Sequence, residues 1–483
     1  MLLCATDMPT RRLSVDQNPP SPSRAIALTV LIDSIRSDEG LEILMDRALT
    51  RTSLDARDRG LAVEIAYGVM RRLRTIDWRL GPVLDKPLAR LPVAVQMLLR
   101  MGAYQLLFLD RVPPSAAVSE SVKLAKAQSR KLKRDWSGLV NAVLRALIRE
   151  PTPPWPSIEA HAAEALAVRY SVPEWLSHRW IDRWGIDRAQ SVCEQASLIP
   201  PVTLRVNRLQ ISRDDYLGRL REAGLKAQPT RVSPAGITLG EGVSIPSLPG
   251  FAGGQFYVED EAAQLIPPLL DAHPGDLVLD ACAAPGGKAT HLAELMKDTG
   301  KIYAVDRSKE RLNVLEANCR RLGHSSLVPI VGDLRHPSWL QAMSHGVARP
   351  NGLVRFDRIL VDAPCSGLGV LRRHPDAKWR KRKNSEQFES HHVLQLQILE
   401  SATLCLRAGG VLVYSTCSTE VEENEDVIDQ FLRSHAEFRR ESVAPWLPAE
   451  GRDFLTERGD LSTMSNEDSM DAFYAARLKH VGS

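Results

Sequence analysis

The chain has 483 residues, of which 44% are hydrophobic and 25% are charged, and its formal net charge is +3. This length exceeds what a single core usually organises, so we expect two or three domains, and the composition is typical of a soluble globular protein. The small net charge excludes a uniformly basic, histone-like surface and leaves room for local basic faces.

Seven cysteines are scattered along the chain without CxxC or Cys/His spacing. This pattern argues against a disulfide framework or a zinc site and favours a reducing cytosol. No stretch approaches the roughly 18 uninterrupted apolar residues of a membrane helix, and the short apolar N-terminus lacks the basic region of a signal peptide. The sequence therefore predicts a cytoplasmic protein without a metal site or a membrane anchor.

The N-terminal third of the chain has helical periodicity. Residues 1–24 are rich in Pro, Ser and Arg and are predicted to be a disordered tail. Within residues 25–150, Leu61, Ile65 and Val69 fall on one helical face, and Pro113-Pro114 suits the start of another helix. We expect an all-helical domain here. Its last third carries a basic run that is either a solvated face or an RNA contact, namely Lys123, Lys126, Arg130, Lys131, Lys133 and Arg134.

Three further segments follow the helical domain. Residues 151–164 begin with a proline-rich stretch and are predicted to be a linker. Residues 165–250 mix a helix with short strands such as Val202–Val206, which indicates a small α+β subdomain. Residues 251–483 alternate short apolar runs with amphipathic helices, which predicts a parallel, doubly wound sheet. The expected strands are Leu277–Leu279, Ile302–Val305, Leu327–Val331, Ile359–Val361 and Val411–Tyr414.

The first of these strands runs into the loop Asp280–Lys288, whose glycines allow a ligand to approach the backbone. The loop is neither a Walker A motif nor GxGxxG, so neither ATP nor a dinucleotide is the ligand expected first. A methionine carboxylate would suit the start of the following helix as well as a phosphate would. Asp306 ends the second strand and can accept ribose hydroxyls, while Asp333 ends the third and can accept an adenine amino group. One such aspartate alone is more often a cap or turn residue, but three at consecutive strand ends favour a nucleoside-bearing ligand.

Two cysteines occupy the ends of strands that are expected to be neighbours. Cys365 lies in Asp362–Gly367 and Cys417 in Ser415–Ser418. The remaining cysteines are interpreted as small buried hydrophobic residues, and Cys282 in the glycine loop is assigned no chemistry.

These segments resemble the RNA (cytosine-5) methyltransferase family, also called the Nol1/Nop2/Sun family, over roughly residues 165–480. The matching motifs are Phe251–Gly254, Val258–Asp260, Pro285–Lys288, Arg373–Asp376 and the two cysteine motifs. The resemblance implies a Rossmann-like class I methyltransferase domain that uses S-adenosyl-L-methionine. The cofactor-binding residues that it implies are Cys282, Ala283, Ala284, Pro285, Gly286, Gly287, Lys288, Asp306, Asp333 and Asp362.

The resemblance also implies partners and a mechanism. The helical domain is similar to the NusB-type RNA-binding fold, and its fusion to such a catalytic domain is typical of bacterial members that methylate one cytosine of 16S ribosomal RNA. Cys417 would add to cytosine C6 as the nucleophile, Cys365 would assist product release, and Asp362 would bond the base near N3. Lys288 either helps to position this site or faces solvent. Glu259 stands where relatives usually have Gln, which affects the contacts of this entry segment rather than the reaction.

A second basic run follows the Pro-Cys motif closely and surrounds Trp379. It is predicted to bind RNA beside the active site, with a solvated loop as the alternative. The target base must leave any stack to reach Cys417, so we expect a loop or an opened region of RNA as substrate. The members of the run are Arg372, Arg373, Lys378, Arg380, Lys381, Arg382 and Lys383.

Two other functions remain as alternatives. A DNA cytosine-5 methyltransferase would use Cys365 as its nucleophile, and a non-catalytic RNA-binding or ribosome-assembly factor would use neither cysteine. The sequence does not choose between naked 16S ribosomal RNA and an assembling small subunit as the partner. Nothing in it calls for more than a monomer.

Overall fold

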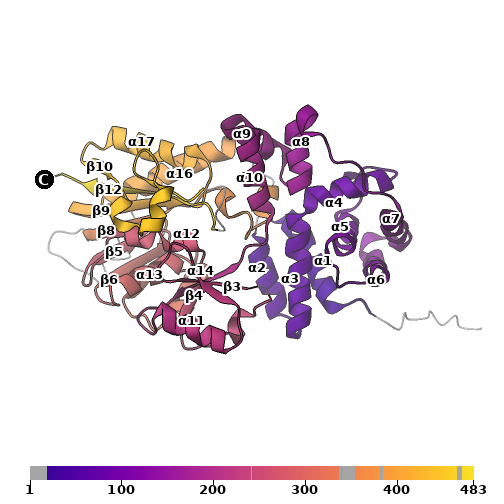
Figure 1. The fold of residues 1–483 in the computed structure, drawn as a ribbon, viewed down its shortest axis with the longest axis horizontal. Helices are drawn as coiled ribbons and strands as arrows, with labels where there is room; N and C mark the ends of the chain where they lie inside the picture. The colour runs from indigo at the N-terminus through magenta and orange to yellow at the C-terminus, as the bar shows by residue number, and fades with distance from the viewer. Residues whose placement is uncertain are drawn as a thin grey trace, which may run out of the picture. The chain divides into compact units, whose positions relative to one another are not determined.

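The structure is a computed structural model that describes residues 19–37, 39–240, 242–336, 339, 354–380, 385–464 and 470–482 (Figure 1). Its contacts divide the chain into two compact units. The first contains the chain up to Ile186 together with His374–Asp376, and the second contains Asp187–Arg373 and Ala377–Ser483.

The regular elements of the first unit are helical, which confirms the all-helical domain predicted for residues 25–150. The unit also holds α8 and α9, although residues 165–186 were expected in the α+β subdomain. Ile65 and Val69 of α3 and Val140 and Leu144 of α7 are fully buried. Gly102 of α5 allows close packing, because a Cβ there would lie 2.4 Å from Leu144 Cδ1. The helices are α1 (Pro22–Arg36), α2 (Leu41–Thr50), α3 (Ala56–Arg71), α4 (Leu73–Leu80), α5 (Val93–Phe108), α6 (Pro114–Leu132), α7 (Ser137–Arg149), α8 (Ile158–Tyr170) and α9 (Glu174–Trp184).

Two helix starts differ from the boundaries expected from sequence. Helix α1 begins at Pro22, inside the segment predicted as a tail, and residues 1–18 of that segment lie outside the described residues. Helix α8 begins at Ile158, inside the predicted linker. Ser157 caps α8 by accepting a hydrogen bond from the Ala160 backbone N–H at 3.2 Å. The proline-rich composition therefore marks only the stretch before this cap.

The second unit opens with α10 (Ile186–Ser197) and a small antiparallel sheet of strand order β2-β3-β1-β4. Tyr216 and Leu220 of the adjoining helix pack with Phe256 of β4 in one buried cluster. This part confirms the predicted α+β subdomain. Its elements are β1 (Val202–Val206), α11 (Arg213–Glu222), β2 (Ala227–Pro229), β3 (Gly236–Leu239) and β4 (Phe256–Val258).

The main sheet has the strand order β10-β12-β9-β8-β5-β6-β7, and β11 pairs with β12. The five neighbouring strands β9, β8, β5, β6 and β7 run parallel, as predicted. Strand β12 pairs antiparallel with β9. The chain builds the sheet outward from β5 to β7 and then returns to place β8 on the other side of β5. Such a reversal of strand order is where ligands bind in doubly wound sheets.

The elements of the main sheet are bounded as follows. The strands are β5 (Leu277–Asp280), β6 (Lys301–Asp306), β7 (Leu327–Val331), β8 (Phe356–Asp362), β9 (Leu406–Thr416), β10 (Phe438–Glu441), β11 (Leu461–Ser462) and β12 (Tyr474–His480). The helices are α12 (Glu261–Gln264), α13 (Gly287–Leu295), α14 (Lys309–Leu322), α16 (Ser385–Thr403) and α17 (Glu425–Ser434).

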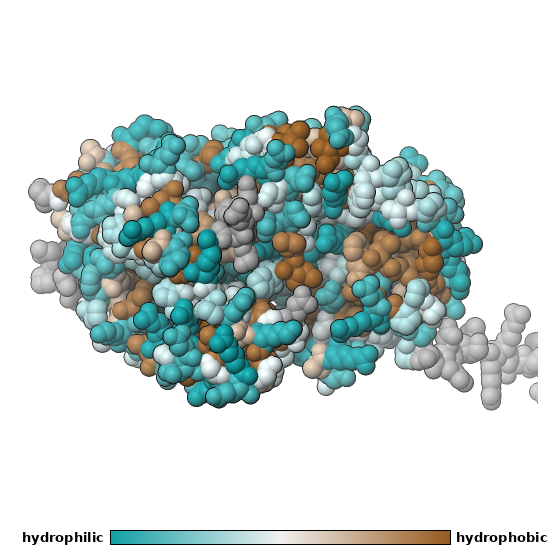
Figure 2. Space-filling view, in the orientation of Figure 1, coloured by the Kyte–Doolittle hydropathy of each residue, from teal (hydrophilic) through white to brown (hydrophobic). Residues whose placement is uncertain are grey.

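Hydrophilic side chains cover most of the face drawn in Figure 2, with smaller hydrophobic patches between them. None of the helices in the described part of the chain has the length and apolar composition needed to cross a membrane.

Candidate active site

The predicted site residues meet at the carboxyl ends of the central parallel strands. Asp280 ends β5, Asp306 ends β6 and Asp362 ends β8. Asp280 is in register with Ala304 on one side and Leu360 on the other. The strand ends therefore form one continuous edge, which carries the glycine loop and both cysteine motifs.

The loop after β5 has a backbone that only glycine favours at its turn. Gly286 has φ +110°, and Gly287 begins α13. A Cβ on residue 287 would lie 2.7 Å from Glu259 Oε1, so any residue larger than glycine would crowd Glu259 at this position. The helix start presents free N–H groups next to this tight turn, which suits an anionic group such as a carboxylate.

Asp280 is a buried carboxyl group, and among the described residues neither of its oxygens accepts a hydrogen bond of normal geometry, although the Cys282 backbone N–H lies near it. Burial raises its pKa to about 7, and the charges of Asp362 and Asp306 act in the same direction, while Lys288 and the backbone N–H of Cys282 oppose them. An unpartnered buried acceptor pair is costly and indicates that donors arrive with a ligand. This observation fits a cofactor that carries an amino group or hydroxyls.

The other two aspartates differ in how free they are to accept hydrogen bonds. Among the described residues, Asp306 accepts the backbone N–H groups of Ser308 at 2.9 Å and Ala284 at 3.3 Å, and Arg311 Nη1 lies 3.6 Å from its Oδ2. This leaves lone pairs for ribose hydroxyls. Both oxygens of Asp333 accept from Arg335 Nε, at 2.9 and 3.0 Å. This pairing lowers the pKa of Asp333 to about 2. Asp333 can bind an adenine amino group only by sharing its oxygens with Arg335.

Arg205 is a contributor to this region that the sequence analysis missed. It lies on β1 and is fully buried, and it donates to Gly287 O at 2.7 Å and Thr290 Oγ1 at 2.9 Å. It also pairs with Glu259 at 2.5 Å and Glu294 at 3.0 Å. A charged residue inside the apolar strand sequence Val-Thr-Leu-Arg-Val was the available signal.

The two cysteines of the predicted catalytic motifs lie together. Cys365 Sγ and Cys417 Sγ are 3.4 Å apart, and both side chains are partly buried. The hydrogen bond with Cys417, burial and the charge of Glu423 raise the pKa of Cys365 well above its ordinary value. These effects favour the thiol form of Cys365.

Lys288 takes part in this site rather than facing solvent. Its ammonium donates to Asp362 Oδ2 at 2.7 Å, and Asp362 Oδ1 accepts from Ser415 Oγ at 2.9 Å. Burial lowers the pKa of Lys288, but the charges of Asp362, Glu259 and Cys417 outweigh burial and leave it raised. Lys288 stays a cation in contact with the strand end that carries Asp362.

Cys282 lies in the loop after β5, and its partly buried side chain packs against the core of the main sheet. Burial, followed by the charges of Asp280, Asp362 and Asp306, raises its pKa well above the ordinary value, so it stays a thiol. Of the other loop residues, Ala283 and Ala284 are buried and Pro285 is exposed.

Three members of the second basic run are structural, so the prediction of RNA contact is corrected for these three and stays a prediction for the rest. Arg372 is buried, and Arg372 and Arg373 both pair with Asp260 and Asp471, at 2.5 to 3.3 Å. Lys378 is also buried. Carboxylates distant in sequence neutralise Arg372 and Arg373, so these residues could not be recognised as internal from the composition of the run. Arg380 is exposed, and Lys381, Arg382 and Lys383 lie outside the described residues.

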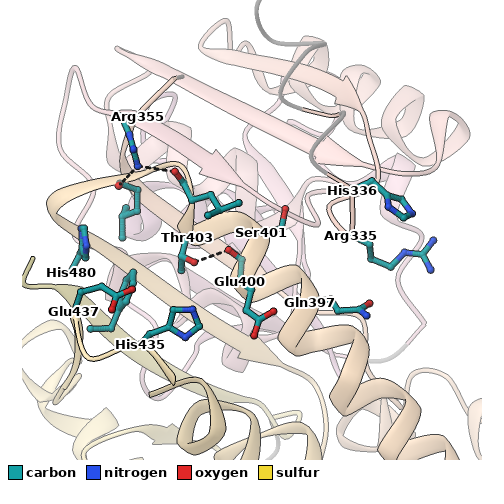
Figure 3. Close-up of a pocket in the computed structure, with 13 residues that line it drawn as sticks. Arg335, His336, Arg355, Gln397, Glu400, Ser401, Thr403, His435, Glu437 and His480 are labelled. Atoms are coloured by element: carbon teal, nitrogen blue, oxygen red, sulfur yellow. Dashed lines mark hydrogen bonds between the residues drawn. The ribbon is translucent and has the colours of Figure 1, made fainter. Parts of the chain in front are cut away.

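A cavity of about 750 Å³ lies elsewhere on the main sheet (Figure 3). Arg355 and Leu406, at the amino ends of β8 and β9, line it, and Arg355 donates to the carbonyl of Leu404 at 2.7 Å. The cysteines follow the opposite ends of these strands, so the cavity is separate from the candidate site. The described residues contain no cluster of His, Cys, Asp and Glu that could hold a metal ion.

Comparison with known proteins gives three matches to family models. Residues 267–479 match the 16S rRNA methyltransferase RsmB/F model, residues 21–149 match the NusB family, and residues 172–246 match the ferredoxin-like domain of RsmF/B-like methyltransferases.

Individual proteins match over most of the chain. The probable ribosomal RNA small subunit methyltransferase B of Synechocystis sp. is 37% identical over 95% of this chain and 99% of its own length. Ribosomal RNA small subunit methyltransferase B of Pseudomonas syringae pv. tomato is 37% identical over 89% of this chain and 91% of its own. The crystal structure of PH0851 superposes with a TM-score of 0.78 and 27% identity, over 96% of this chain and 99% of that one.

Proposed function

Since the chain belongs to the family of 16S ribosomal RNA methyltransferases that includes small subunit methyltransferase B, we propose that it methylates C5 of one cytosine in 16S ribosomal RNA. Cys417 acts as the nucleophile and Cys365 assists product release. The observation that carries this proposal is the pair of cysteines 3.4 Å apart at the ends of β8 and β9, next to the Lys288–Asp362 ion pair.

S-adenosylmethionine is the methyl donor of this enzyme class and supplies an electrophilic methyl group on a sulfonium. The residues of the site fit it. Asp306 offers lone pairs to ribose hydroxyls, the start of α13 suits the methionine carboxylate, and the unpartnered Asp280 offers acceptors to an amino group. The loop glycines keep side chains out of this space.

Cytosine C5 is too weak a nucleophile to take the methyl group unaided. Addition of the Cys417 sulfur to C6 places electron density on C5, and the new C5–methyl bond then forms within the covalent adduct. Removal of the C5 proton lets the C5–C6 double bond re-form as the Cys417–C6 bond breaks. Cys365, 3.4 Å from Cys417, assists this release step: its thiol gives its proton to the departing Cys417 sulfur, and the resulting Cys365 thiolate is the base that takes the C5 proton.

Asp362 and Lys288 organise the base-binding side of the site. The Asp362 carboxylate accepts from Lys288 and Ser415, and 30% of its side chain remains exposed, so it can accept a further hydrogen bond from the base. A bond to a protonated N3 would stabilise the electron-rich ring of the adduct.

The match to ribosomal RNA methyltransferases over most of the chain argues against the DNA-methyltransferase alternative, whose substrate is DNA. The family membership and the assembled cysteine pair argue against a non-catalytic assembly factor.

Labelled S-adenosylmethionine offered with small-subunit ribosomal RNA, naked or in assembling particles, tests the reaction. We expect label in 5-methylcytosine at one position. Cys417→Ser should abolish it, while the control Cys405→Ala, at the amino end of β9, should retain it. Methylation of another base or ring position contradicts the proposal.

The aspartate at the end of β6 tests the cofactor site separately. Asp306→Asn removes the charge that would hold the ribose hydroxyls, so we expect the Kd for S-adenosylmethionine to rise about tenfold or more, since each charge-assisted hydrogen bond contributes about 1.5–3 kcal/mol. Asp357→Asn, at the amino end of β8, is the matched control and should leave that Kd unchanged. Equal Kd values for the two variants, measured by calorimetry, would exclude Asp306 from the cofactor site.

A further inference from the structure

One buried carboxylate binds the residues that follow both cysteines. Glu423 is fully buried, and its Oε1 accepts the Ser366 backbone N–H at 2.8 Å. Its Oε2 accepts the Ser366 hydroxyl at 2.5 Å and also the Ser418 hydroxyl. Ser366 directly follows Cys365, and Ser418 directly follows Cys417.

The neighbouring Asn424 holds the Cys417 motif from both sides. Its Oδ1 accepts from Thr416 Oγ1 at 2.5 Å, and its Nδ2 donates to Ser418 O at 3.0 Å. The sequence analysis left Glu423 out, because it stands in an acidic stretch that is indistinguishable by composition from a solvated turn.

Glu423 is charged in spite of its burial. Burial raises its pKa, but His391, Ser366 and Ser418 outweigh that effect and leave the pKa below its ordinary value. His391, on α16, places Nδ1 2.7 Å from Glu423 Oε1. An ionised carboxylate is an acceptor at both oxygens, which is what three converging donors require.

The position of this carboxylate matters because the sheet no longer sets the spacing there. The β8–β9 ladder ends at the pair Asp362 and Ser415, and both cysteines lie beyond it. Past that pair, the Glu423 carboxylate connects the two motifs through one residue after each cysteine. Two direct contacts accompany it: the Ser366 and Ser418 hydroxyls lie 3.2 Å apart, and the Gly369 N–H donates to Cys417 O at 2.9 Å.

We propose that Glu423 is a positioning residue that holds the Cys365 and Cys417 sulfurs at their working separation by binding Ser366 and Ser418 together. The proposal deepens the proposed function and rests on it, since release by Cys365 requires that sulfur beside the Cys417 adduct. Glu423 is fully buried and acts through Ser366 and Ser418 rather than on the reacting atoms.

Glu423→Gln tests the proposal, because the amide keeps the shape but has one acceptor oxygen for three donors. We expect kcat to fall about 100-fold, as displacement of about 1 Å can cost, with KM for S-adenosylmethionine unchanged. Release should slow more than adduct formation, so covalent RNA–protein complex should accumulate on denaturing gels. Ser418→Ala, which keeps the carboxylate, is a milder second variant and should show a smaller change in the same direction.

A readout without RNA separates this proposal from the reaction itself. Diamide takes two electrons and two protons from the thiols as a Cys365–Cys417 disulfide forms, and its rate, followed by mass spectrometry, reports how well the sulfurs are held together. We expect this rate to fall several-fold in Glu423→Gln. Asp460→Asn is the matched control, since Asp460 is an equally buried carboxylate that binds Arg440 and Tyr474 instead, and it should keep the wild-type rate.

Unchanged disulfide rate and kcat in folded Glu423→Gln would overturn the proposal, as would an equal slowing in Asp460→Asn. If the wild type proves not to methylate cytosine C5, the proposed function fails. A slower disulfide in Glu423→Gln alone would then still support the positioning role.

Discussion

At the scale of single residues, Asp280 lies in an environment that its position at a strand end does not suggest. A strand-end aspartate is ordinarily ionised and hydrogen-bonded, whereas this one is fully buried with both oxygens unpartnered among the described residues. Burial raises its pKa from 3.8 to about 7. The folded protein without its cofactor therefore holds a proton here that the unfolded chain releases.

This proton predicts a pH dependence of stability. Between about pH 4 and pH 7 the folded state binds more protons than the unfolded state, so the free energy of unfolding falls as the pH rises through this window and is level above it. Asp280→Asn has no such proton and should lack this part of the fall. Urea unfolding of both proteins from pH 4 to pH 8 measures the difference, and parallel curves would contradict the assignment.

At the scale of elements, a strand of the small sheet supports the cofactor loop of the main sheet. Arg205 on β1 binds Gly287 O, Thr290 and Glu294 of α13 and Glu259 after β4. One guanidinium cannot neutralise two carboxylates fully. Accordingly, burial leaves the pKa of Glu259 raised, while Arg205 and His324 hold that of Glu294 below its ordinary value despite burial.

Removal of this cation should therefore be costly. Arg205→Met leaves Glu259 and Glu294 buried without their partner, which destabilises a protein by about 3–5 kcal/mol. Chemical denaturation of the full chain measures the loss. Arg213→Met, which removes an arginine paired with the exposed Asp214, is the control and should change stability by less than about 1 kcal/mol. Equal effects of the two substitutions would show that the buried network contributes little.

The tight start of α13 gives a second prediction at this scale. Gly287→Ala pushes a methyl group against Glu259 Oε1 and should weaken S-adenosylmethionine binding by shifting the loop. Gly218→Ala in α11 has nothing within 4 Å of the new Cβ and should instead stabilise the protein by about 0.5–1 kcal/mol. Calorimetric titration and thermal unfolding of both variants test this contrast. An unchanged cofactor Kd in Gly287→Ala would mean that the loop tolerates the added methyl group.

At the scale of the whole molecule, the sequence predicted the architecture well where local periodicity decides it. Strand β1 and the five parallel strands of the main sheet lie where the apolar runs placed them, and α6 starts at Pro114 as expected. The predicted linker, residues 151–164, is too long, because Ser157 caps a helix that begins at Ile158, directly after the prolines. The cysteine pair followed from two strand ends that proved to be neighbours.

Interactions between distant segments were not predictable in the same way. The partners of Arg372 and Arg373 are Asp260 and Asp471, and the residues bound by Glu423, Ser366 and Ser418, follow the ends of two different strands. Nothing in the composition of either segment distinguishes an internal charge from a solvated one. Tertiary packing alone decides which charged residues are structural.

RNA binding by the whole chain should depend on the basic end of α6, whose Lys126, Arg130 and Lys131 are exposed. Replacement of all three by Ala should make the slope of log K for ribosomal RNA against log salt shallower by about 2 to 3, since each phosphate contact contributes about 0.7–0.9. Arg320→Ala, an exposed cation of α14 paired with Glu316, is the control and should leave the slope unchanged. A triple variant with the wild-type slope would make this run a solvated face.

The identity of the cysteine that bonds to the base tests the central claim most directly. Ribosomal RNA carrying 5-fluorocytosine cannot lose a C5 proton, so the adduct should persist and can be digested and mapped by mass spectrometry. We predict that the RNA remains on the peptide containing Cys417 and that Cys417→Ser forms no adduct. RNA attached to Cys365 would contradict the account and favour the DNA-methyltransferase type of mechanism.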